Sequence, residues 1–315
     1  MRFISIGDLV LDYYYEDGNL LGVCGGNTSH NIIANLAHNN IPTAVFATCG
    51  CDIQGDIAIK SLNDLNVDTA HIKRLNTVRT RALHASYTKG NSQTTRICPY
   101  CGTKTWYYDS QIDIDDILSS LQETDILVFD NLNSKNQTII DNTSNIKIID
   151  IGYYYEFKNI SDEELINKIR HKFKIINFNE RVTNYLMERF NLDEFGIYCL
   201  FSPEFMSITR GEKGATFIYN NAVYNFKLTN IGNTIDSSGA GDAFISSIIR
   251  DWINNDYSFS PELFKKWYNN SCKLTSKVVS KMGARGHIHP IYKVNTTDKC
   301  SCDEISLIRS KQLTR

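Results

Sequence analysis

The sequence predicts an α/β protein with a doubly wound, mostly parallel sheet and a small second β-sheet that serves as a lid. Two observations predict this fold class. Short apolar runs, each followed by a turn residue or a polar break, alternate with helical windows that carry one apolar face. One stretch near residues 80–110 breaks the alternation and looks like extended strands. A chain of 315 residues is long enough for one large domain of this kind or two small ones.

The composition is that of an ordinary globular protein. Apolar residues make up 42% of the chain and charged residues 22%, which excludes disordered, collagen-like and coiled-coil chains. The formal net charge of −2 creates no strong field, so neither nucleic acid nor an anionic membrane is an expected partner. No apolar stretch reaches the roughly 18 residues of a membrane span, and residues 1–7 resemble a strand more than a signal peptide. We therefore expect a cytoplasmic protein.

Six short apolar runs are predicted to form the parallel sheet. Each ends at a polar or turn residue, which is the pattern of a strand covered on both faces. The runs are Phe3–Ile6, Ala44–Thr48, Ile126–Asp130, Ile146–Ile151, Ile175–Phe178 and Met206–Thr209.

Two windows between these runs are predicted to be helices that pack on the sheet, because their apolar residues recur at helical spacing. The first window carries Ile32, Ile33, Leu36 and Ala37 on one face, and the second carries Phe244, Ile245, Ile248, Ile249 and Trp252. Strands that alternate with such helices favour an open sheet covered on both faces.

The lid is predicted from two segments of the chain, about residues 11–24 and 80–110. In the second segment, Arg81–Tyr87 and Thr103–Tyr108 both look extended. In the first, Glu16–Asn19 has the composition of a turn between two strands. We expect these strands to form a small accessory sheet beside the main domain.

The main domain is expected to span residues 1–292, and residues 293–315 are expected to form a polar, loosely held tail. Tyr13, Tyr14 and Tyr15 lie in the predicted lid. They would either stack on a ligand ring or fill the seam between lid and domain, and we favour packing for at least two of them.

A glycine-containing loop, Asp236–Phe244, opens the second predicted helix. Its small residues let the backbone approach a ligand, and the free N–H groups of a helix start suit a phosphate. Asp242 lies in the first turn, where a carboxylate could act as general base for an attacking hydroxyl. Ordinary helix capping is the alternative. The loop lacks the Gly-Lys-Ser/Thr of a Walker A motif, and Phe244 replaces the third glycine of a dinucleotide fingerprint.

This loop, Asp-Ser-Ser-Gly-Ala-Gly-Asp, resembles the C-terminal signature of the ribokinase-like (PfkB) carbohydrate kinase family, usually Asp-Thr-x-Gly-Ala-Gly-Asp, with Ser237 in place of threonine. Other segments are similar to family motifs and occur in the expected order. They are Gly7–Asp12, Gly25–Asn27, Gly50–Gly55, Asn177–Glu180 and Thr209–Gly214. The resemblance spans about residues 3–290 and implies a ribokinase-like, Rossmann-type domain with a β-sheet lid.

The resemblance also implies an ATP- and Mg²⁺-dependent phosphoryl transfer. Asp242 matches the family's catalytic base, and the backbone N–H groups of Gly239, Ala240 and Gly241 would form the anion hole for the moving phosphoryl group. Closure of the lid would exclude water from the site. Because lid strands can pair between chains, a homodimer through the lid is expected.

Further contacts to the nucleotide side follow from the same resemblance. Asn177 and Glu180 match residues that organise Mg²⁺, largely through water. Asp236 matches a position near the monovalent-cation site of many relatives, which implies a K⁺ ion. The implied nucleotide contacts are Thr209, Gly211, Gly214 and Ser237.

The implied substrate side begins with Asp12, which would accept hydrogen bonds from two hydroxyl groups. Gly25 and Gly26 would let backbone amides approach a sugar, and Asn27 follows them in the same turn. The first signature departs from the family at His30, where asparagine is usual, and Asn31 one place later is the candidate substrate contact.

A shorter likeness points to one branch of the family. The segments Gly7–Asp8, Asp12–Tyr13 and Gly25–Asn27 are similar to those of the fructoselysine-kinase branch. Nucleoside kinases share the same scaffold and stay open as an alternative.

Two cysteine pairs suggest a structural zinc ion. Cys98 and Cys101 have the spacing of a zinc knuckle and are followed by glycine. Cys300 and Cys302 lie in the polar tail, so the four thiolates would attach the tail to the lid through one Zn²⁺. The alternative is a hairpin turn with exposed thiols.

The function predicted from the sequence is ATP-dependent transfer of the γ-phosphate to a hydroxyl of a small sugar or sugar derivative. A nucleoside kinase on the same fold is one alternative. A non-catalytic sugar- or nucleotide-binding protein with a zinc docking module is another, although the complete Asp242 loop speaks against lost catalysis. An oxidoreductase is disfavoured, since no early dinucleotide fingerprint is present.

Overall fold

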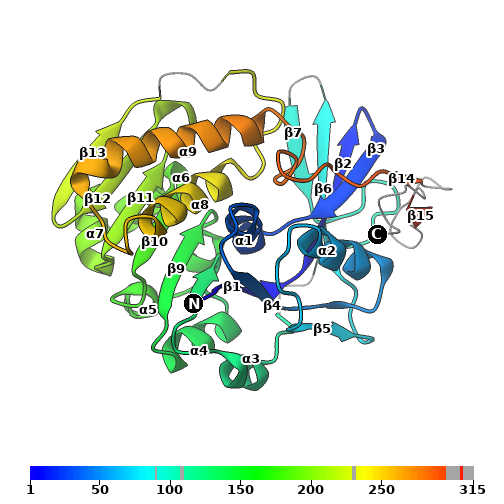
Figure 1. Ribbon diagram of the computed structural model, residues 1–315, viewed down its shortest axis with the longest axis horizontal. Helices are drawn as coiled ribbons and strands as arrows, with labels where there is room; N and C mark the ends of the chain where they lie inside the picture. Colours follow the sequence, from blue (N-terminus) through cyan, green and yellow to red (C-terminus); the bar gives the residue numbers. More distant parts are fainter. Residues whose placement is uncertain (89–90, 107–109, 229–231, 296–305, 308–315) are drawn as a thin grey trace.

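A computed structural model describes residues 1–88, 91–106, 110–228, 232–295 and 306–307. In this part of the chain a large sheet runs through the centre with helices on both sides, and a smaller sheet stands to one side as the lid (Figure 1). The predicted fold class is confirmed.

The large sheet has the strand order β13-β12-β11-β10-β9-β8-β1-β4-β5. Its strands are β1 (Phe3–Asp8), β4 (Thr43–Gly50), β5 (Ile72–Leu75), β8 (Ile126–Phe129), β9 (Ile146–Ile151), β10 (Ile175–Asn179), β11 (Phe205–Thr209), β12 (Ala215–Tyr219) and β13 (Ala222–Phe226). The six predicted runs are the adjacent strands from β11 to β4, all parallel. The sequence analysis did not predict β5, or β12 and β13, which pair antiparallel at the opposite edge.

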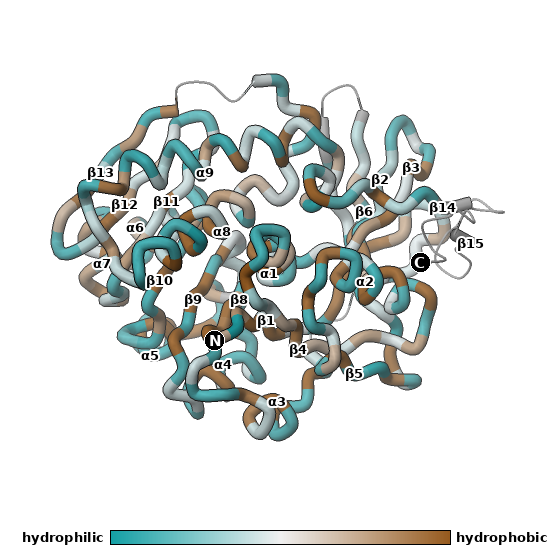
Figure 2. The backbone as a smooth tube through the Cα atoms, viewed as in Figure 1, coloured by the Kyte–Doolittle hydropathy of each residue, from teal (hydrophilic) through white to brown (hydrophobic). Residues whose placement is uncertain are grey.

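Both faces of this sheet are buried because successive side chains along each strand enter different cores. In β1, Phe3 packs into one core and Ile4 into the other, and in β4 Val45 and Phe46 divide in the same way. Figure 2 shows hydrophobic residues along the central strands, as a sheet covered on two sides requires.

The helices divide between the two cores. One core includes side chains of α1 (Thr28–His38), α2 (Ile53–Asn63), α8 (Ala240–Ile253) and α9 (Phe264–Val279). The other includes side chains of α3 (Ile114–Ser120), α4 (Ser134–Asn142), α5 (Asp162–Ile169), α6 (Glu180–Phe190) and α7 (Glu194–Phe201). Short 3₁₀ turns, η1 (Tyr155–Phe157), η2 (Gly211–Lys213) and η3 (Pro261–Leu263), connect these elements.

The lid is a four-stranded sheet of order β3-β2-β6-β7, built from β2 (Val10–Glu16), β3 (Asn19–Gly25), β6 (Arg81–Thr88) and β7 (Asn91–Thr95). The strand expected over Thr103–Tyr108 is not found in its described portion. There the chain makes a single isolated bridge, between Lys104 and Ile97, while Tyr107 and Tyr108 lie outside the described residues. Backbone hydrogen bonds still join Thr105 to Arg96 and to Ala82, each 2.9 Å long, without forming a continuous strand.

The three consecutive tyrosines of β2 are each 1% exposed. Tyr13 and Tyr15 belong to the main core and stack on His84 of β6 at ring-centre distances of 4.9 and 5.8 Å. The expected packing of at least two of them is therefore what the structure has. Of the tail, the described residues form one short antiparallel pair, β14 (Val294–Asn295) with β15 (Ser306–Leu307). None of the described helices is both long and apolar enough to span a bilayer.

Candidate active site

The conformation of the loop before α8 is fixed by the backbone of Gly239 and by hydrogen bonds to Asp236. Gly239, the N-cap residue of α8, has φ of 77°, and a Cβ atom there would lie 2.7 Å from the Ala284 backbone. The Asp236 carboxylate accepts N–H bonds from Ser238 and Gly283, each 2.8 Å long. At Gly241 a Cβ atom would meet nothing within 4 Å. The start of α8 therefore has open space beside Gly241, while the Ala240 N–H donates to the Ser237 carbonyl at 3.2 Å.

Asp242 follows directly in the first turn of α8 and is buried. Its Oδ2 accepts a hydrogen bond of 2.7 Å from the Asn31 amide of α1. Burial raises the pKa of Asp242 to about 6, with a further rise from Asp130, while Asn31 and Arg285 lower it. A carboxylate with this pKa is ionised at neutral pH and can still accept a proton, as a general base must.

Arg285 fixes the orientation of Asn31. Its Nε donates to Asn31 Oδ1 at 2.8 Å, so the amide nitrogen of Asn31 faces Asp242. Its two terminal nitrogens donate to the Ser61 hydroxyl at 3.0 Å and the Gly26 carbonyl at 3.1 Å. The side chain is 1% exposed, which is tolerable for a guanidinium only with this number of acceptors. The sequence analysis did not single out Arg285.

The two glycines at the end of β3 make room for these groups. A Cβ atom at Gly25 would lie 2.6 Å from Arg285 Nη1, and one at Gly26 would lie 2.3 Å from Asp12 Oδ2. The sequence analysis explained these two glycines by the close approach of a sugar. The structure shows that they are also needed because a side chain there would clash with Arg285 or Asp12.

Asp12, on β2 of the lid, is the second buried carboxylate. Its Oδ2 accepts a 3.3 Å bond from the Tyr14 hydroxyl, and its Oδ1 has no hydrogen-bond partner among the described residues. Burial raises the pKa of Asp12 to about 7, and Arg285 lowers it. An unsatisfied carboxylate oxygen on the wall of a cleft suits a ligand hydroxyl.

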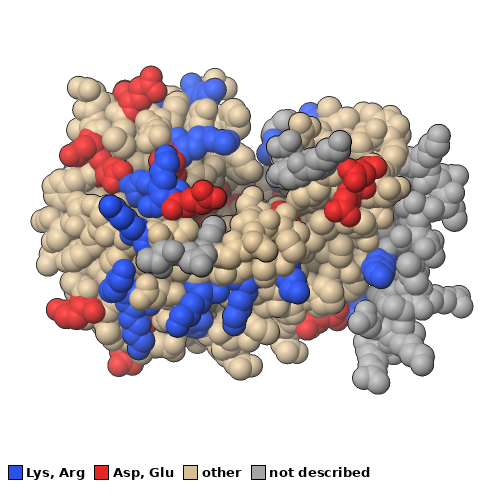
Figure 3. Space-filling view, turned by 90° about the horizontal axis from the view of Figure 1, so that it is seen from above, with Lys and Arg blue, Asp and Glu red and all other residues tan. Residues whose placement is uncertain are grey.

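One cleft of about 830 Å³ brings most of the predicted residues together. Figure 3 shows it as a hollow between the lobe with the nucleotide motifs and the lobe with the lid. The predicted residues along its wall are Asp12, Asn27, Asn31, Asn177, Glu180, Thr209, Gly211, Ser237, Gly239, Ala240, Gly241 and Asp242.

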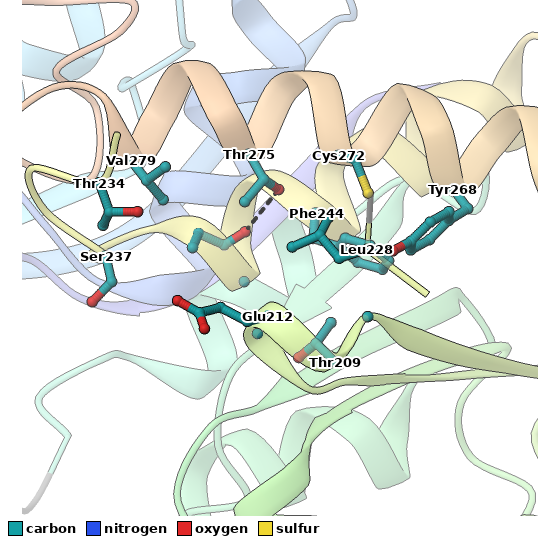
Figure 4. Close-up of a pocket in the computed structure, with 14 residues that line it drawn as sticks. Thr209, Glu212, Leu228, Thr234, Ser237, Phe244, Tyr268, Cys272, Thr275 and Val279 are labelled. Atoms are coloured by element: carbon teal, nitrogen blue, oxygen red, sulfur yellow. Dashed lines mark hydrogen bonds between the residues drawn. The ribbon is translucent and has the colours of Figure 1, made fainter. Parts of the chain in front are cut away.

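A second pocket of about 240 Å³ adjoins this cleft at the start of α8, since Ser237, Ala240 and Gly241 line both. Its walls are largely apolar, with Phe244, Tyr268 and Val279 on α8 and α9 (Figure 4). The predicted nucleotide contacts Thr209, Gly211, Gly214 and Ser237 all lie in its wall. An apolar slot that ends at helix amides fits a base with attached phosphates.

On the far side of the cleft, Asn177 is 1% exposed, and both of its polar groups are bonded within the protein. Its Nδ2 donates to Asp150 Oδ1 at 2.8 Å, and its Oδ1 accepts from Ser207 at 2.6 Å. Asp150, which the sequence analysis did not identify, lines the cleft, and burial and the Asp242 charge raise its pKa to about 8. Glu180 is half-buried and 2.8 Å from Lys213.

Among the described residues, no three His, Cys, Asp or Glu side chains converge as a metal site. Mg²⁺ stays a prediction, and Asp150 and Glu180 are the acidic residues that line this part of the cleft. Asp236 already accepts two N–H groups, and K⁺ near it stays a prediction.

The zinc prediction rests partly on residues that the structure does not describe. Cys98 is buried and Cys101 exposed, on a tight turn in which the Gly102 N–H donates to the Cys98 carbonyl at 3.0 Å. Cys300 and Cys302 lie outside the described residues. The four-thiolate zinc site therefore stays a prediction.

Comparison with known proteins bears on this site. The family described as pfkB family carbohydrate kinase matches residues 23–260. No curated protein matches the sequence.

Solved structures resemble the chain over nearly its whole length. A sugar kinase of Pyrococcus horikoshii in complex with ATP is 20% identical, with a TM-score of 0.70 over 90% of this chain and 93% of that one. A Xylella fastidiosa fructokinase with bound ATP is 14% identical, with a TM-score of 0.73 over 90% and 94%. A Methanocaldococcus jannaschii nucleoside kinase is 14% identical, with a TM-score of 0.69 over 91% and 94%. These likenesses show a shared fold.

Proposed function

Because this chain belongs to the pfkB family of carbohydrate kinases, we propose that it transfers the γ-phosphate of ATP to a hydroxyl of a small sugar or sugar derivative. One observation carries the proposal. The buried Asp242 lines the cleft with Asp12 and directly follows Ala240 and Gly241, which line both this cleft and the apolar pocket.

The acceptor would bind on the lid side of the cleft. Asp12 Oδ1, which lacks a partner among the described residues, would accept a hydrogen bond from a substrate hydroxyl. A second hydroxyl would face Asp242, whose orientation Asn31 and Arg285 hold. Asp242 would take the proton of that hydroxyl. The hydroxyl oxygen would form a bond to the γ-phosphorus while the bond from the γ-phosphorus to the bridging oxygen of ADP breaks.

The phosphates would lie at the N-terminus of α8. The N–H groups of Gly239 and Gly241 would face the charge that develops on the transferred phosphoryl group, supported by the positive end of the helix dipole. The N–H of Ala240 would join them on leaving the Ser237 carbonyl, to which it donates at 3.2 Å. Mg²⁺, when bound through water at Asp150 and Glu180, would neutralise phosphate charge. The lid would cover the acceptor and keep water from attacking ATP.

A nucleoside kinase is the second candidate. The structural likeness to the nucleoside kinase is close to that of the sugar kinases, and the half-buried Trp106 lines the lid side of the cleft, where it would stack on a base. The fructoselysine-kinase branch stays a proposal within the sugar reading, as does a homodimer through the lid.

A coupled assay of ADP release over sugars, fructosamines and nucleosides, each at saturating MgATP, tests the proposal. We expect one class to raise ADP release well above the rate with ATP alone. If every class leaves the rate unchanged while the protein binds ATP, the non-catalytic reading replaces the kinase.

A further inference from the structure

One hydroxyl in the wall of the apolar pocket lacks a hydrogen-bond partner. Tyr268 on α9 is 2% exposed, and its hydroxyl is bonded to none of the described residues. The Cys272 thiol lies close to it, one turn later on the same helix, but a thiol is a weak acceptor. Burial raises the pKa of Tyr268, so the hydroxyl keeps its proton at neutral pH. A buried donor of this kind is costly unless a ligand supplies an acceptor.

The position of this hydroxyl is fixed by the rings around it. The Tyr268 ring stacks on Phe226 of β13 at a ring-centre distance of 4.9 Å and meets Phe244 of α8 edge-on at 6.3 Å. Figure 4 shows the side chain reaching from α9 into the pocket, with the hydroxyl directed toward Phe244 and Leu228. Because packing already holds the ring, little conformational freedom is lost when the hydroxyl binds a ligand.

Tyr268 lies at the end of the pocket that is remote from the start of α8. Thr275 marks the other end, because its hydroxyl donates to the Ala240 carbonyl at 3.4 Å (Figure 4). Tyr268 and Thr275 are about two helical turns, or roughly 10 Å, apart along α9. With phosphates at the start of α8, the ribose would span this distance and the base would reach the Tyr268 hydroxyl.

We propose that the Tyr268 hydroxyl binds the edge of the nucleotide base, and that the pocket takes adenine and guanine alike. A hydroxyl can donate one hydrogen bond and accept others, and both purines carry ring nitrogens that accept. Phe244 and Val279 contact either base through apolar area, which does not depend on the substituents of the purine. This inference rests on the proposed kinase function, since it assigns the pocket to the phosphoryl donor, and it extends the donor from ATP to GTP.

Calorimetric titration with ADP, GDP and ribose 5-diphosphate tests the contact, since the last compound lacks a base. We expect the wild type to bind ADP and GDP with Kd values within about threefold of each other. Tyr268→Phe should weaken both about three- to tenfold, the size of one neutral hydrogen bond, and leave ribose 5-diphosphate unchanged. A smaller loss, or one of equal size for all three compounds, overturns the contact. A larger preference of the wild type for one purine overturns the extended donor range.

The stability of the free protein gives a second readout. Removing a buried hydroxyl that has no partner should leave the Tm of Tyr268→Phe at or above that of the wild type, by up to about 4 °C, although the variant binds ADP less tightly. Tyr224→Phe is the matched control, because the Tyr224 ring packs on Phe264 at 5.1 Å rather than in the pocket wall, and it should bind both nucleotides as the wild type does. A lower Tm of free Tyr268→Phe would give the hydroxyl a structural role and overturn the inference.

Binding distinguishes failure of this inference from failure of the proposed function. If no acceptor raises ADP release, yet Tyr268→Phe weakens ADP and GDP selectively, the base contact stands and the kinase function falls. If an acceptor is phosphorylated while Tyr268→Phe binds both nucleotides like the wild type, the contact falls alone. A wild type that binds none of the three compounds overturns both.

Discussion

The proposed chemistry depends on Asp242, because its carboxylate lies in the first turn of α8 and lines the cleft in which the acceptor is expected. Asp242→Asn keeps an oxygen that can accept the 2.7 Å bond from Asn31 but cannot take up a proton at neutral pH. We expect kcat to fall at least about a hundredfold, with Tm and ATP affinity close to wild type. Steady-state ADP release and thermal melting measure this, and near-normal turnover would end the general-base assignment.

The protonation of Asp242 should also set the pH dependence. With a pKa of about 6, the base is ionised and active above pH 6 and is protonated, hence inactive, below it. We expect kcat/KM to fall toward acid through pH 6, approaching tenfold per pH unit at lower pH, in a profile taken between pH 5 and 8. A profile flat down to pH 5 would contradict this.

Arg285 provides the matched change for that profile. Its charge lowers the pKa of Asp242, so Arg285→Met should move the acidic limb to higher pH, whereas Arg285→Lys keeps the charge and should move it less. Circular dichroism checks that both variants fold, because Arg285→Met leaves the acceptors Asn31 and Ser61 without their donor. An unmoved limb in folded Arg285→Met would remove this residue from the electrostatics of the base.

At the scale of elements, we expect substitutions of the two glycines at the start of α8, Gly239 and Gly241, to differ in their effect on stability. Gly239→Ala forces a side chain onto a residue with φ of 77° and places its Cβ 2.7 Å from Ala284, so we expect a loss of about 1–3 kcal/mol in the free energy of unfolding. Gly241→Ala meets no atom within 4 Å and should leave stability unchanged or raise it by up to about 1 kcal/mol.

The Gly239→Ala and Gly241→Ala variants should also differ in activity. The methyl group of Gly241→Ala would occupy space beside the α8 amides, so its KM for ATP should rise although the fold is intact. Chemical denaturation and ADP-release kinetics together check both halves. Equal stability of the two variants would show that the loop is not constrained as the structure implies.

At the scale of the whole molecule, we predict that one zinc ion joins the tail to the lid. The cysteine spacing predicts about one zinc per chain, held by Cys98, Cys101, Cys300 and Cys302. Elemental analysis should find this stoichiometry in the purified protein and a loss of zinc in Cys98→Ser. The exposed Cys199, on α7, is the control, and Cys199→Ser should keep the metal. Protein without zinc would leave the Cys98–Cys101 segment as a plain turn.

The sequence by itself determined the central sheet and the loop that opens α8. The six adjacent strands β11, β10, β9, β8, β1 and β4 are continuous apolar runs, and the start of α8 combines small residues with an amphipathic helix. Both features can be predicted because each depends on residues that are neighbours in the sequence. It did not reveal β13, whose exposure alternates at the sheet edge, nor β12, although four of the five β12 residues are buried.

Only the tertiary structure decided how the Asp242 carboxylate is held and which side chains meet at Trp106. Arg285 meets Asn31 across 254 positions of sequence, and Asn31 meets Asp242 across 211. Trp106 lies between Arg81 and Arg96 because the chain turns back after β7, which no periodicity of these residues announces. Such contacts form only where the fold brings distant segments together, so the local spacing of residues cannot predict them.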